Sequence, residues 1–311
     1  MLFTATSREK NSPSTISFAR LTTLLPMSGP PSIDVAPFAS HLLSDLLSHQ
    51  FRIMMTLKEK LARKERVIVF AVSRLFHHNL IQMLGMSGSF DGFWIDAEHA
   101  GFSATDMEIA AMAGRCQGLD VFARIAPTDY ALVTRCFESG VGGVMAAQIH
   151  SAAQAEEFVR WCKFAPRGTR GLNTGGYDGG FGRLTQAEFT QRANAESFVA
   201  IQIETLGSLE EAEAIAAIDG VDLLFIGPSD LSQALGVTGD FMNPLCLAAI
   251  DRVAAACEKH GKTWGAVTTT PEHARMLADK GCHMLSPTND VRLFNAGIKA
   301  VQQTFSDLFG N

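Results

Sequence analysis

The sequence predicts an α/β protein built as one closed (β/α)8 barrel of the TIM type. Three observations support this fold class: eight short apolar runs rich in β-branched and aromatic residues, helical patterns between them, and no GxGxxG motif after the first run. Continuous apolar strands separated by helices indicate a parallel sheet covered on both faces. Eight strand–helix units close into a barrel of about 250 residues. An open doubly wound sheet is the weaker alternative, because a dinucleotide-binding sheet of that kind carries the glycine motif.

The predicted strands recur at a regular beat from residue 66 onward. They cover 66–72, 92–96, 121–125, 143–147, 198–204, 222–227, 263–267 and 283–287. Helical patterns lie between them, as in 151–164, 207–218, 243–261 and 270–281. Several of these patterns start at a Ser, Thr or Asn that can cap a helix and stop at a Gly, which favours helix termination.

Residues 1–54 differ from the rest of the chain, so we assign them to an extension and residues 55–311 to the barrel. The extension is rich in Ser, Thr and Pro, and we expect it to be poorly ordered. Its Arg and Ser content, with few acids, would suit an organelle transit peptide. The preferred interpretation is an over-extended start, because Met54 and Met55 directly precede the first periodic segment.

The composition narrows the class of function. The chain has 311 residues, is 47% hydrophobic and carries a formal net charge of -6. Because no apolar run approaches the roughly 20 residues of a membrane-spanning helix, we expect a soluble, cytoplasmic protein without a membrane partner. Mild acidity without a Lys/Arg cluster argues against nucleic-acid binding. The six cysteines show no paired spacing, and we expect free thiols in a reducing compartment.

Polar side chains recur where the predicted strands end, in contrast with the apolar residues before them. In chain order these residues are Asp96, Glu98, His99, Arg124, Gln202, Glu204 and Asp230. In a barrel, the C-terminal ends of the strands form one mouth where the active site is built. Their recurrence at the same end of several strands predicts a catalytic rim, although any one of them could be a solvated side chain.

Glu204 and Asp230 form an oxygen-donor pair suited to a hard divalent cation. Mg²⁺ or Mn²⁺ commonly takes one or two protein carboxylates and leaves its other positions to water and substrate. Co²⁺ is a further candidate, and zinc is the weaker alternative because no His or Cys pair has zinc-site spacing. The structural alternatives are an exposed Glu204 and an Asp230 that caps the following helix.

Arg124 and His99 are the candidate catalytic residues, with Asp96 as a supporting acid. A guanidinium inside an apolar strand is costly unless it is paired, and it keeps its charge. Arg124 is therefore either half of a buried ion pair or a cation that binds a developing oxyanion or a substrate oxo-acid. His99 has the pKa range of a general base, and Asp96, three residues earlier, could fix its tautomer. A structural histidine is the alternative.

Two glycine-containing segments complete the candidate site. In "GPSD", 227–230, the first two residues predict a tight bend, and the N–H groups that follow predict a cradle for a carboxylate. The segment "LNTGGYDGGFG", 172–182, is either a lid or subunit contact or a flexible surface loop.

With these elements in place, the chain resembles the HpcH/HpaI aldolase family, the metal-dependent class II pyruvate aldolases with a phosphoenolpyruvate/pyruvate-type barrel. The resemblance runs from about Leu57 to the C-terminus, and its carriers are "IDAEH" (95–99), "RI" (124–125), "PRGTRG" (166–171), "QIET" (202–205) and "FIGPSDLS" (225–232). It implies reversible cleavage of a 4-hydroxy-2-oxo acid to pyruvate and an aldehyde through a metal-bound pyruvate enolate. It also implies a homohexamer built by exchange of C-terminal helices.

The resemblance further implies a role for each residue of the rim. Glu204 and Asp230 correspond to the metal ligands. Arg124 corresponds to the residue that stabilises the enolate oxygen. His99 corresponds to the base, which acts through a metal-bound water and is oriented by Asp96.

The resemblance also separates the two halves of the substrate. The backbone amides of Ser229 and Asp230 correspond to the seat of the pyruvate carboxylate, with Gln202 as a further substrate contact. Some members carry a Trp late in the first strand, where this chain has Val69 and Phe70. Together with the unusual glycine-rich segment, this departure leaves the aldehyde partner open.

Three alternative functions remain at this stage. Oxaloacetate decarboxylation passes through the same enolate and would use the same site. A lyase acting on CoA thioesters is disfavoured, because no basic patch for the CoA phosphates is evident. A catalytically idle barrel that serves as an assembly subunit is disfavoured by the full set of polar strand ends.

Overall fold

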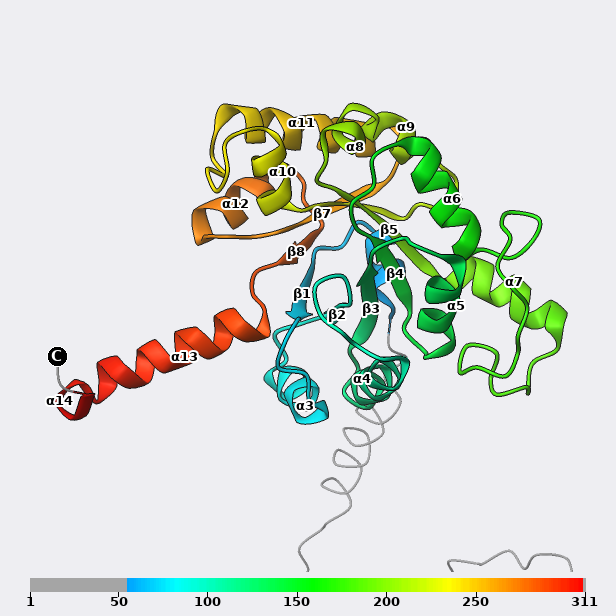
Figure 1. Ribbon diagram of the computed structural model, residues 1–311, viewed down its shortest axis with the longest axis horizontal. Helices are drawn as coiled ribbons and strands as arrows, with labels where there is room; N and C mark the ends of the chain where they lie inside the picture. The colour runs from blue at the N-terminus through cyan, green and yellow to red at the C-terminus, as the bar shows by residue number, and fades with distance from the viewer. Residues whose placement is uncertain (1–54, 310–311) are drawn as a thin grey trace, which may run out of the picture. The chain divides into compact units, whose positions relative to one another are not determined.

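Eight parallel strands form a closed barrel in chain order, which confirms the predicted (β/α)8 fold (Figure 1). The computed structural model describes residues 55–309. The strands are β1 (Val67–Val72), β2 (Gly92–Asp96), β3 (Asp120–Ile125), β4 (Gly143–Ala146), β5 (Phe198–Ile203), β6 (Leu223–Ile226), β7 (Thr263–Val267) and β8 (Met284–Ser286). β8 pairs with β1 and closes the barrel. The expectations for residues 1–54 lie outside the described residues.

The connections carry the helices that the sequence pattern predicts. They are α2 (Leu57–Ala62), α3 (His78–Ser87), α4 (Ala104–Cys116), α5 (Tyr130–Glu138), α6 (Ala152–Cys162), α7 (Gln186–Glu196), α8 (Leu206–Glu210), α9 (Ala212–Ala217), α10 (Pro228–Ala234), α11 (Pro244–Lys259), α12 (Pro271–Asp279), α13 (Asp290–Thr304) and α14 (Ser306–Phe309). Side-chain caps start many of them. At α4, the Ser103 hydroxyl accepts from the N–H of Asp106, and the Asp106 carboxylate accepts from the N–H of Ser103.

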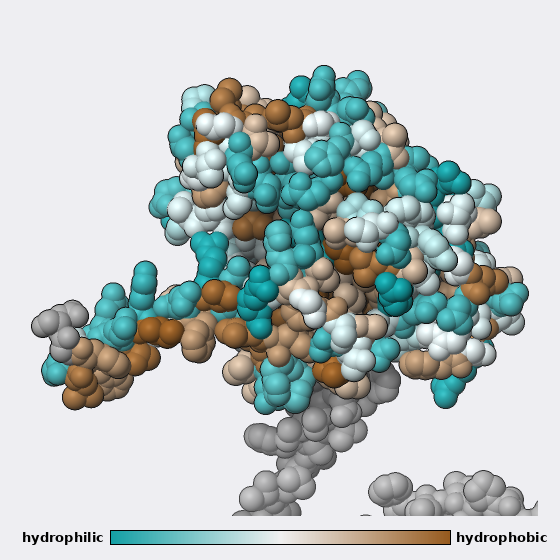
Figure 2. Space-filling view, in the orientation of Figure 1, coloured by the Kyte–Doolittle hydropathy of each residue, from teal (hydrophilic) through white to brown (hydrophobic). Residues whose placement is uncertain are grey.

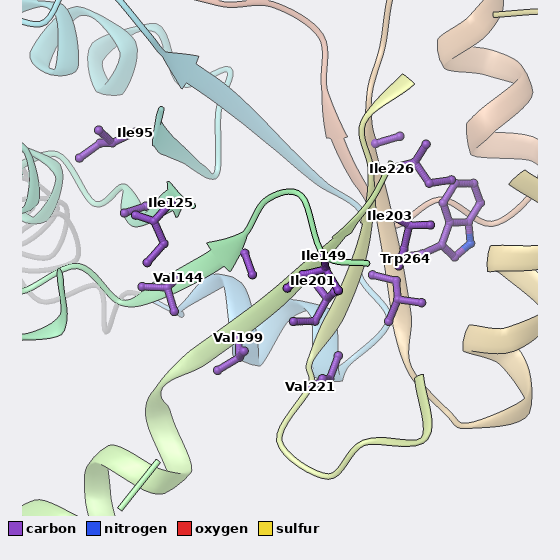
Figure 3. Packing of buried hydrophobic residues seen from close by; sticks show 14 of the residues in the cluster. Ile95, Ile125, Val144, Ile149, Val199, Ile201, Ile203, Val221, Ile226 and Trp264 are labelled. Carbon is purple, nitrogen blue, oxygen red and sulfur yellow. The ribbon is translucent and has the colours of Figure 1, made fainter. Parts of the chain in front are cut away.

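The apolar core has two layers because successive strand residues point to opposite faces. The outer layer lies between strands and helices and includes Ile95, Ile125 and Ile201 (Figure 3). The inner layer fills the barrel itself with large side chains: Val69, Trp94, Phe122, Met145, Phe198, Phe225 and Met284, closed from below by Leu57 and Leu61 of α2. The polar ends of the strands therefore lie above a packed apolar floor.

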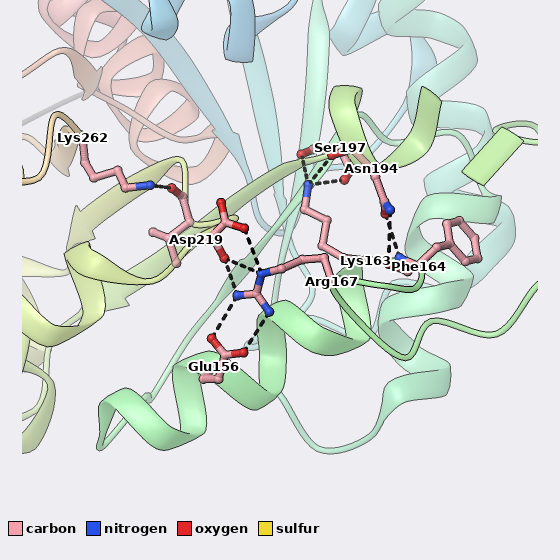
Figure 4. Close-up of polar contacts among 9 residues, drawn as sticks. Glu156, Lys163, Phe164, Arg167, Asn194, Ser197, Asp219 and Lys262 are labelled. Atoms are coloured by element: carbon pink, nitrogen blue, oxygen red, sulfur yellow. Dashed lines mark hydrogen bonds and ion pairs between the residues drawn. The ribbon is translucent and has the colours of Figure 1, made fainter. Parts of the chain in front are cut away.

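Polar side chains tie α6, α7 and the start of β5 together (Figure 4). Arg167 makes a two-point ion pair with Glu156, with N–O distances of 2.8 and 2.9 Å. The Lys163 amine donates to the carbonyls of Asn194 and Ser197 and to the Ser197 hydroxyl. The Lys163 amine is thus a hydrogen-bond donor at the C-terminal end of α7. Burial lowers its pKa to about 8.

α13 leaves the barrel and carries an apolar face along its length (Figures 1 and 2). Its exposed apolar residues are Leu293, Phe294, Ile298 and Val301, followed by Phe305, Leu308 and Phe309. Asp290 anchors the base of the helix, since its buried carboxylate accepts from the backbone N–H groups of Ser73, Arg74 and Leu75 after β1. Within residues 55–309, no helix is long and apolar enough to cross a membrane.

Candidate active site

A cavity of about 560 Å³ opens at the C-terminal ends of the strands. The residues of the predicted rim that line it are Asp96, His99, Arg124, Gln202, Ser229 and Asp230. Glu204 does not line the cavity and is buried, with 1% of its area exposed. The structure thus brings together side chains that are up to 134 residues apart in the sequence.

Arg124 is held in a buried ion pair at this mouth. The β2–β3 register places Asp96 directly opposite Arg124. Nη2 of the guanidinium lies 2.7 Å from Oδ2 of Asp96, and Nε lies 3.1 Å from Oδ1. Nε is also 3.4 Å from Oε2 of Glu98. The ion-pair interpretation of Arg124 is therefore correct, and because the side chain also lines the cavity, the pairing positions the cation for a ligand.

The contact expected between Asp96 and the His99 imidazole differs from the observed one. From His99, Asp96 accepts the backbone N–H at 3.2 Å and not the imidazole. Nε2 of the imidazole instead lies 3.7 Å from Oε2 of Glu98, and the His99 side chain is 57% exposed. The physical reason is the strand register, because a buried guanidinium needs the facing carboxylate more than an exposed imidazole does.

Glu204 is a buried carboxylate with a perturbed pKa. Oε1 accepts from the backbone N–H of Gln148 at 2.8 Å and from its side-chain amide at 3.2 Å. Burial, assisted by the nearby Glu98 and Asp230, raises the pKa of Glu204 to about 7. The N–H of Gln148 and the charge of Arg124 oppose this rise. Glu204 is thus an acid that lacks a full counter-charge.

Two residues that support Glu204 were missed or underrated at the sequence level. Gln148 lies two residues after β4 and adopts a left-handed φ of 52°, which aims its N–H at the carboxylate. Its place just after the fourth predicted strand was a usable signal. At Gly227, an added Cβ would collide with Oε2 of Glu204 and Nε2 of Gln202. Glycine is therefore required here for space as well as for the predicted bend.

Asp230 lies in the first turn of α10 and lines the cavity. The N-cap position belongs to Gly227, and Pro228 occupies N1, so the alternative role of Asp230 as a helix cap is wrong. The Gln202 amide donates from Nε2 to the Glu204 carboxylate. Within residues 55–309, Oε1 of Gln202 and Oε2 of Glu98 are buried without a hydrogen-bond partner.

The donor set suits a hard divalent cation, although the described residues contain no cluster of three or more His, Cys, Asp or Glu side chains placed to hold a metal. Glu204 and Asp230 supply carboxylates, and the unpartnered amide oxygen of Gln202 is a third oxygen donor nearby. Oxygen ligands of this kind match Mg²⁺ or Mn²⁺, which complete their coordination with water and substrate. Burial is the main cause of the raised pKa of Glu204, and the nearby carboxylates of Glu98 and Asp230 add to it.

Other parts of the rim were not anticipated. Trp94 lies on the same face of β2 as Asp96, and its indole N–H donates to the Ser286 hydroxyl at 3.0 Å. The Arg124 guanidinium lies 5.0 Å from the Trp94 ring centroid. Arg74, which follows β1, and several residues that follow β8 also line the cavity. Period-two alternation in "GFWID" was the available signal for Trp94.

The glycine-rich segment 172–182 does not border this mouth within the described chain. Tyr177 packs under Arg115, whose guanidinium carbon is 3.6 Å from the ring centroid. Asp178 pairs with the buried Arg170. The segment is thus fixed against α4 and α5 near the opposite end of the barrel, and the expectation of a lid over the site is wrong.

Comparisons with known proteins identify the family of the chain and match its fold. Residues 66–296 match the HpcH/HpaI aldolase/citrate lyase family. A 4-hydroxy-4-methyl-2-oxoglutarate aldolase of Hapsidospora irregularis is 36% identical over 62% of this chain and 72% of its own. A 5-keto-4-deoxy-D-glucarate aldolase of Klebsiella pneumoniae is 29% identical over 72% of this chain and 86% of its own. The crystal structure of an HpcH/HpaI aldolase from Desulfitobacterium hafniense DCB-2 superposes with a TM-score of 0.73 at 29% identity, covering 80% of this chain and 97% of that one.

We expect Asp96→Asn to lower the free energy of unfolding by about 3 kcal/mol, because it leaves a buried guanidinium with Glu98 as its only acidic partner. Urea denaturation followed by circular dichroism measures this change. Glu213→Gln is the control, since its ion pair with Lys259 is exposed and should contribute nothing measurable. Equal stability of Asp96→Asn and the parent protein would show that the pair does not constrain the mouth.

Proposed function

Because the chain belongs to the HpcH/HpaI aldolase/citrate lyase family and is a lyase, we propose that it reversibly cleaves a 4-hydroxy-2-oxo acid to pyruvate and an aldehyde or ketone. The observation that carries this proposal is that Arg124 and Asp230 line one cavity and that both lie close enough to the buried Glu204 carboxylate to shift its pKa. The 2-oxo acid is an anion, and a cation beside an oxygen-donor set is what its carboxylate and carbonyl oxygens require. Relatives named as aldolases of oxo acids support this substrate class.

Glu204 and Asp230 are the residues proposed to hold a divalent ion, with Mg²⁺ or Mn²⁺ preferred and Co²⁺ as a further candidate. Such an ion, when bound, supplies Lewis-acid polarisation of the 2-oxo group. The backbone N–H groups of Ser229 and Asp230 are proposed to bind the substrate carboxylate. Gln202 directs its amide toward the same corner of the cavity and orients the substrate.

Arg124 and His99 are proposed to carry the proton and charge movements. His99 takes the proton of the 4-hydroxyl group, and the oxygen's electrons form the new carbonyl as the C3–C4 bond breaks. The electron pair of that bond passes to the pyruvate fragment as an enolate, whose oxygen Arg124 stabilises. Asp96 holds the guanidinium in place at 2.7 Å and is a positioning residue. Protonation at C3 then releases pyruvate.

The experiment that tests this proposal measures pyruvate release by the purified protein from a panel of 4-hydroxy-2-oxo acids and from oxaloacetate. We expect cleavage of the hydroxy-oxo acids, loss of activity after EDTA treatment and recovery with Mg²⁺ or Mn²⁺. Activity that survives EDTA unchanged would refute the metal assignment. Release from oxaloacetate alone would replace the aldolase assignment with decarboxylation through the same enolate.

Arg124→Ala should lower kcat/KM by about 10²–10³, the usual cost of removing one preorganised oxyanion partner. Because this change leaves the buried Asp96 without its ion-pair partner, Arg124→Lys is the second variant. It keeps the charge but loses the two-point contact. Arg63→Ala, at an exposed position before β1, is the control. Near-normal turnover of a folded Arg124→Ala protein would show that another group stabilises the enolate.

We further propose a homohexamer in which the apolar face of α13 packs against neighbouring copies. Supporting this, the face borders a hollow of about 720 Å³ between α3 and α13, lined by Leu80, Met83, Phe294 and Ile298. A large contiguous apolar surface that is exposed on a globular protein often marks an interface. Light scattering should report six chains, and Phe294→Asp combined with Ile298→Asp should dissociate them without loss of helical signal. A monomeric parent protein would contradict the proposal.

A further inference from the structure

We propose that Arg74 is a specificity-determining residue that binds a second carboxylate, located on the carbonyl fragment of the substrate. The inference rests on the proposed aldol cleavage and narrows its substrate class to 4-hydroxy-2-oxo dicarboxylic acids. The product that leaves with pyruvate is then an oxo acid rather than a neutral aldehyde.

Arg74 lies across the barrel from the residues proposed to hold the metal ion. In a closed ring of eight strands, β1 lies opposite β5. Arg74 follows β1, and Arg292 lies in the first turn of α13, which follows β8 next to β1. Glu204 follows β5. The single cavity of about 560 Å³ is lined by Arg74 and Arg292 on one side and by Gln202 and Asp230 on the other, so a substrate held at β5 and β6 extends toward the arginines.

The two sides of the cavity differ in the charge of their side chains. On the β5–β6 side, Asp230 lines the cavity and Glu204 is buried after β5, whereas two guanidinium groups line the β8–β1 side. Arg292 is fixed by donating to the carbonyls of Thr268 at 3.2 Å and Thr269 at 2.9 Å. Among residues 55–309, no carboxylate forms an ion pair with Arg74 or Arg292, while the ion pairs of the mouth all involve Arg124 or His99. Positive charge at this side of the cavity is therefore available to a ligand.

The neighbouring acid, Asp290, already has hydrogen-bond partners in the segment after β1. Its carboxylate accepts from the N–H groups of Ser73, Arg74 and Leu75 at 3.0, 2.7 and 2.6 Å and from the Ser73 hydroxyl at 2.5 Å. Burial opposes ionisation, but these bonds outweigh it and lower the pKa of Asp290. The loop backbone is thus held rigidly and its amides are used, so the Arg74 guanidinium remains as the anion-binding group. A planar guanidinium suits a carboxylate, which it can bind through two parallel hydrogen bonds.

The kinetic test compares two substrates that differ only in the distal group. Cleavage of 4-hydroxy-2-oxoglutarate yields pyruvate and glyoxylate, whereas 4-hydroxy-2-oxopentanoate yields pyruvate and acetaldehyde. We expect the parent protein to prefer the dicarboxylate. Arg74→Gln should lower kcat/KM for the dicarboxylate by about 10- to 100-fold, the effect of losing one charged hydrogen-bonding partner, and leave the monocarboxylate within about twofold. Arg63→Gln, the matched charge control, should change neither.

A binding test separates this inference from the proposed reaction. 2-Oxoglutarate and 2-oxopentanoate lack the 4-hydroxyl group, so aldol cleavage cannot occur, and they differ only in the distal carboxylate. Calorimetry should find tighter binding of 2-oxoglutarate to the parent protein and loss of that preference in Arg74→Gln. Equal affinities in the parent protein, or a preference that survives the substitution, would overturn the role of Arg74. A preference lost on substitution in a protein that cleaves neither hydroxy-oxo acid would retain the carboxylate site and overturn the aldolase proposal.

Discussion

The buried ion pair between Arg124 and Asp96 is the constraint on which the rest of the mouth depends. Burying a guanidinium in a barrel of apolar strands is tolerable only if a carboxylate faces it, and the β2–β3 register provides that carboxylate. Both carboxylate oxygens of Asp96 contact the guanidinium, and this pairing fixes the orientation in which the Arg124 side chain borders the cavity. Glu98 also lies within ion-pair distance of Arg124. Glu204 receives only amide hydrogen bonds, and burial together with the nearby Glu98 and Asp230 raises its pKa.

Closure of the barrel is what gathers these groups. Below the rim, side chains such as Trp94, Phe122 and Phe225 fill the interior, and the cavity lies above them at the C-terminal ends of the strands. The same packing supports the site directly, because Trp94 lies under the Arg124 guanidinium and is itself held by Ser286 of β8. The polar mouth is therefore rigid at its base, which is what preorganised charge stabilisation requires.

The start of α13 links the rim of the site to the surface of the molecule. Asp290 binds the backbone after β1, which carries Arg74, and the following turn carries Arg292. The apolar face of α13 begins immediately afterwards, at Leu293 and Phe294. Any partner that covers this face would also fix the segment bearing the two arginines. The proposed assembly face and the proposed carboxylate-binding residue are thus linked through the start of α13, although they involve different residues.

The fold class and most of the rim could be predicted from the sequence alone. Apolar runs with helices between them are local patterns, and a polar residue at the end of a strand, such as Glu204 or Asp230, lies at the mouth once the barrel closes. Which side chains of different segments pair depends on the tertiary structure. Register set Asp96 against Arg124 rather than His99, and the left-handed backbone at Gln148 aimed its N–H at Glu204. Arg74 borders the cavity just after β1, and it lies across from β5 because the closed ring of strands places β1 opposite β5. These contacts join residues far apart in the chain, and no local periodicity encodes which of them meet.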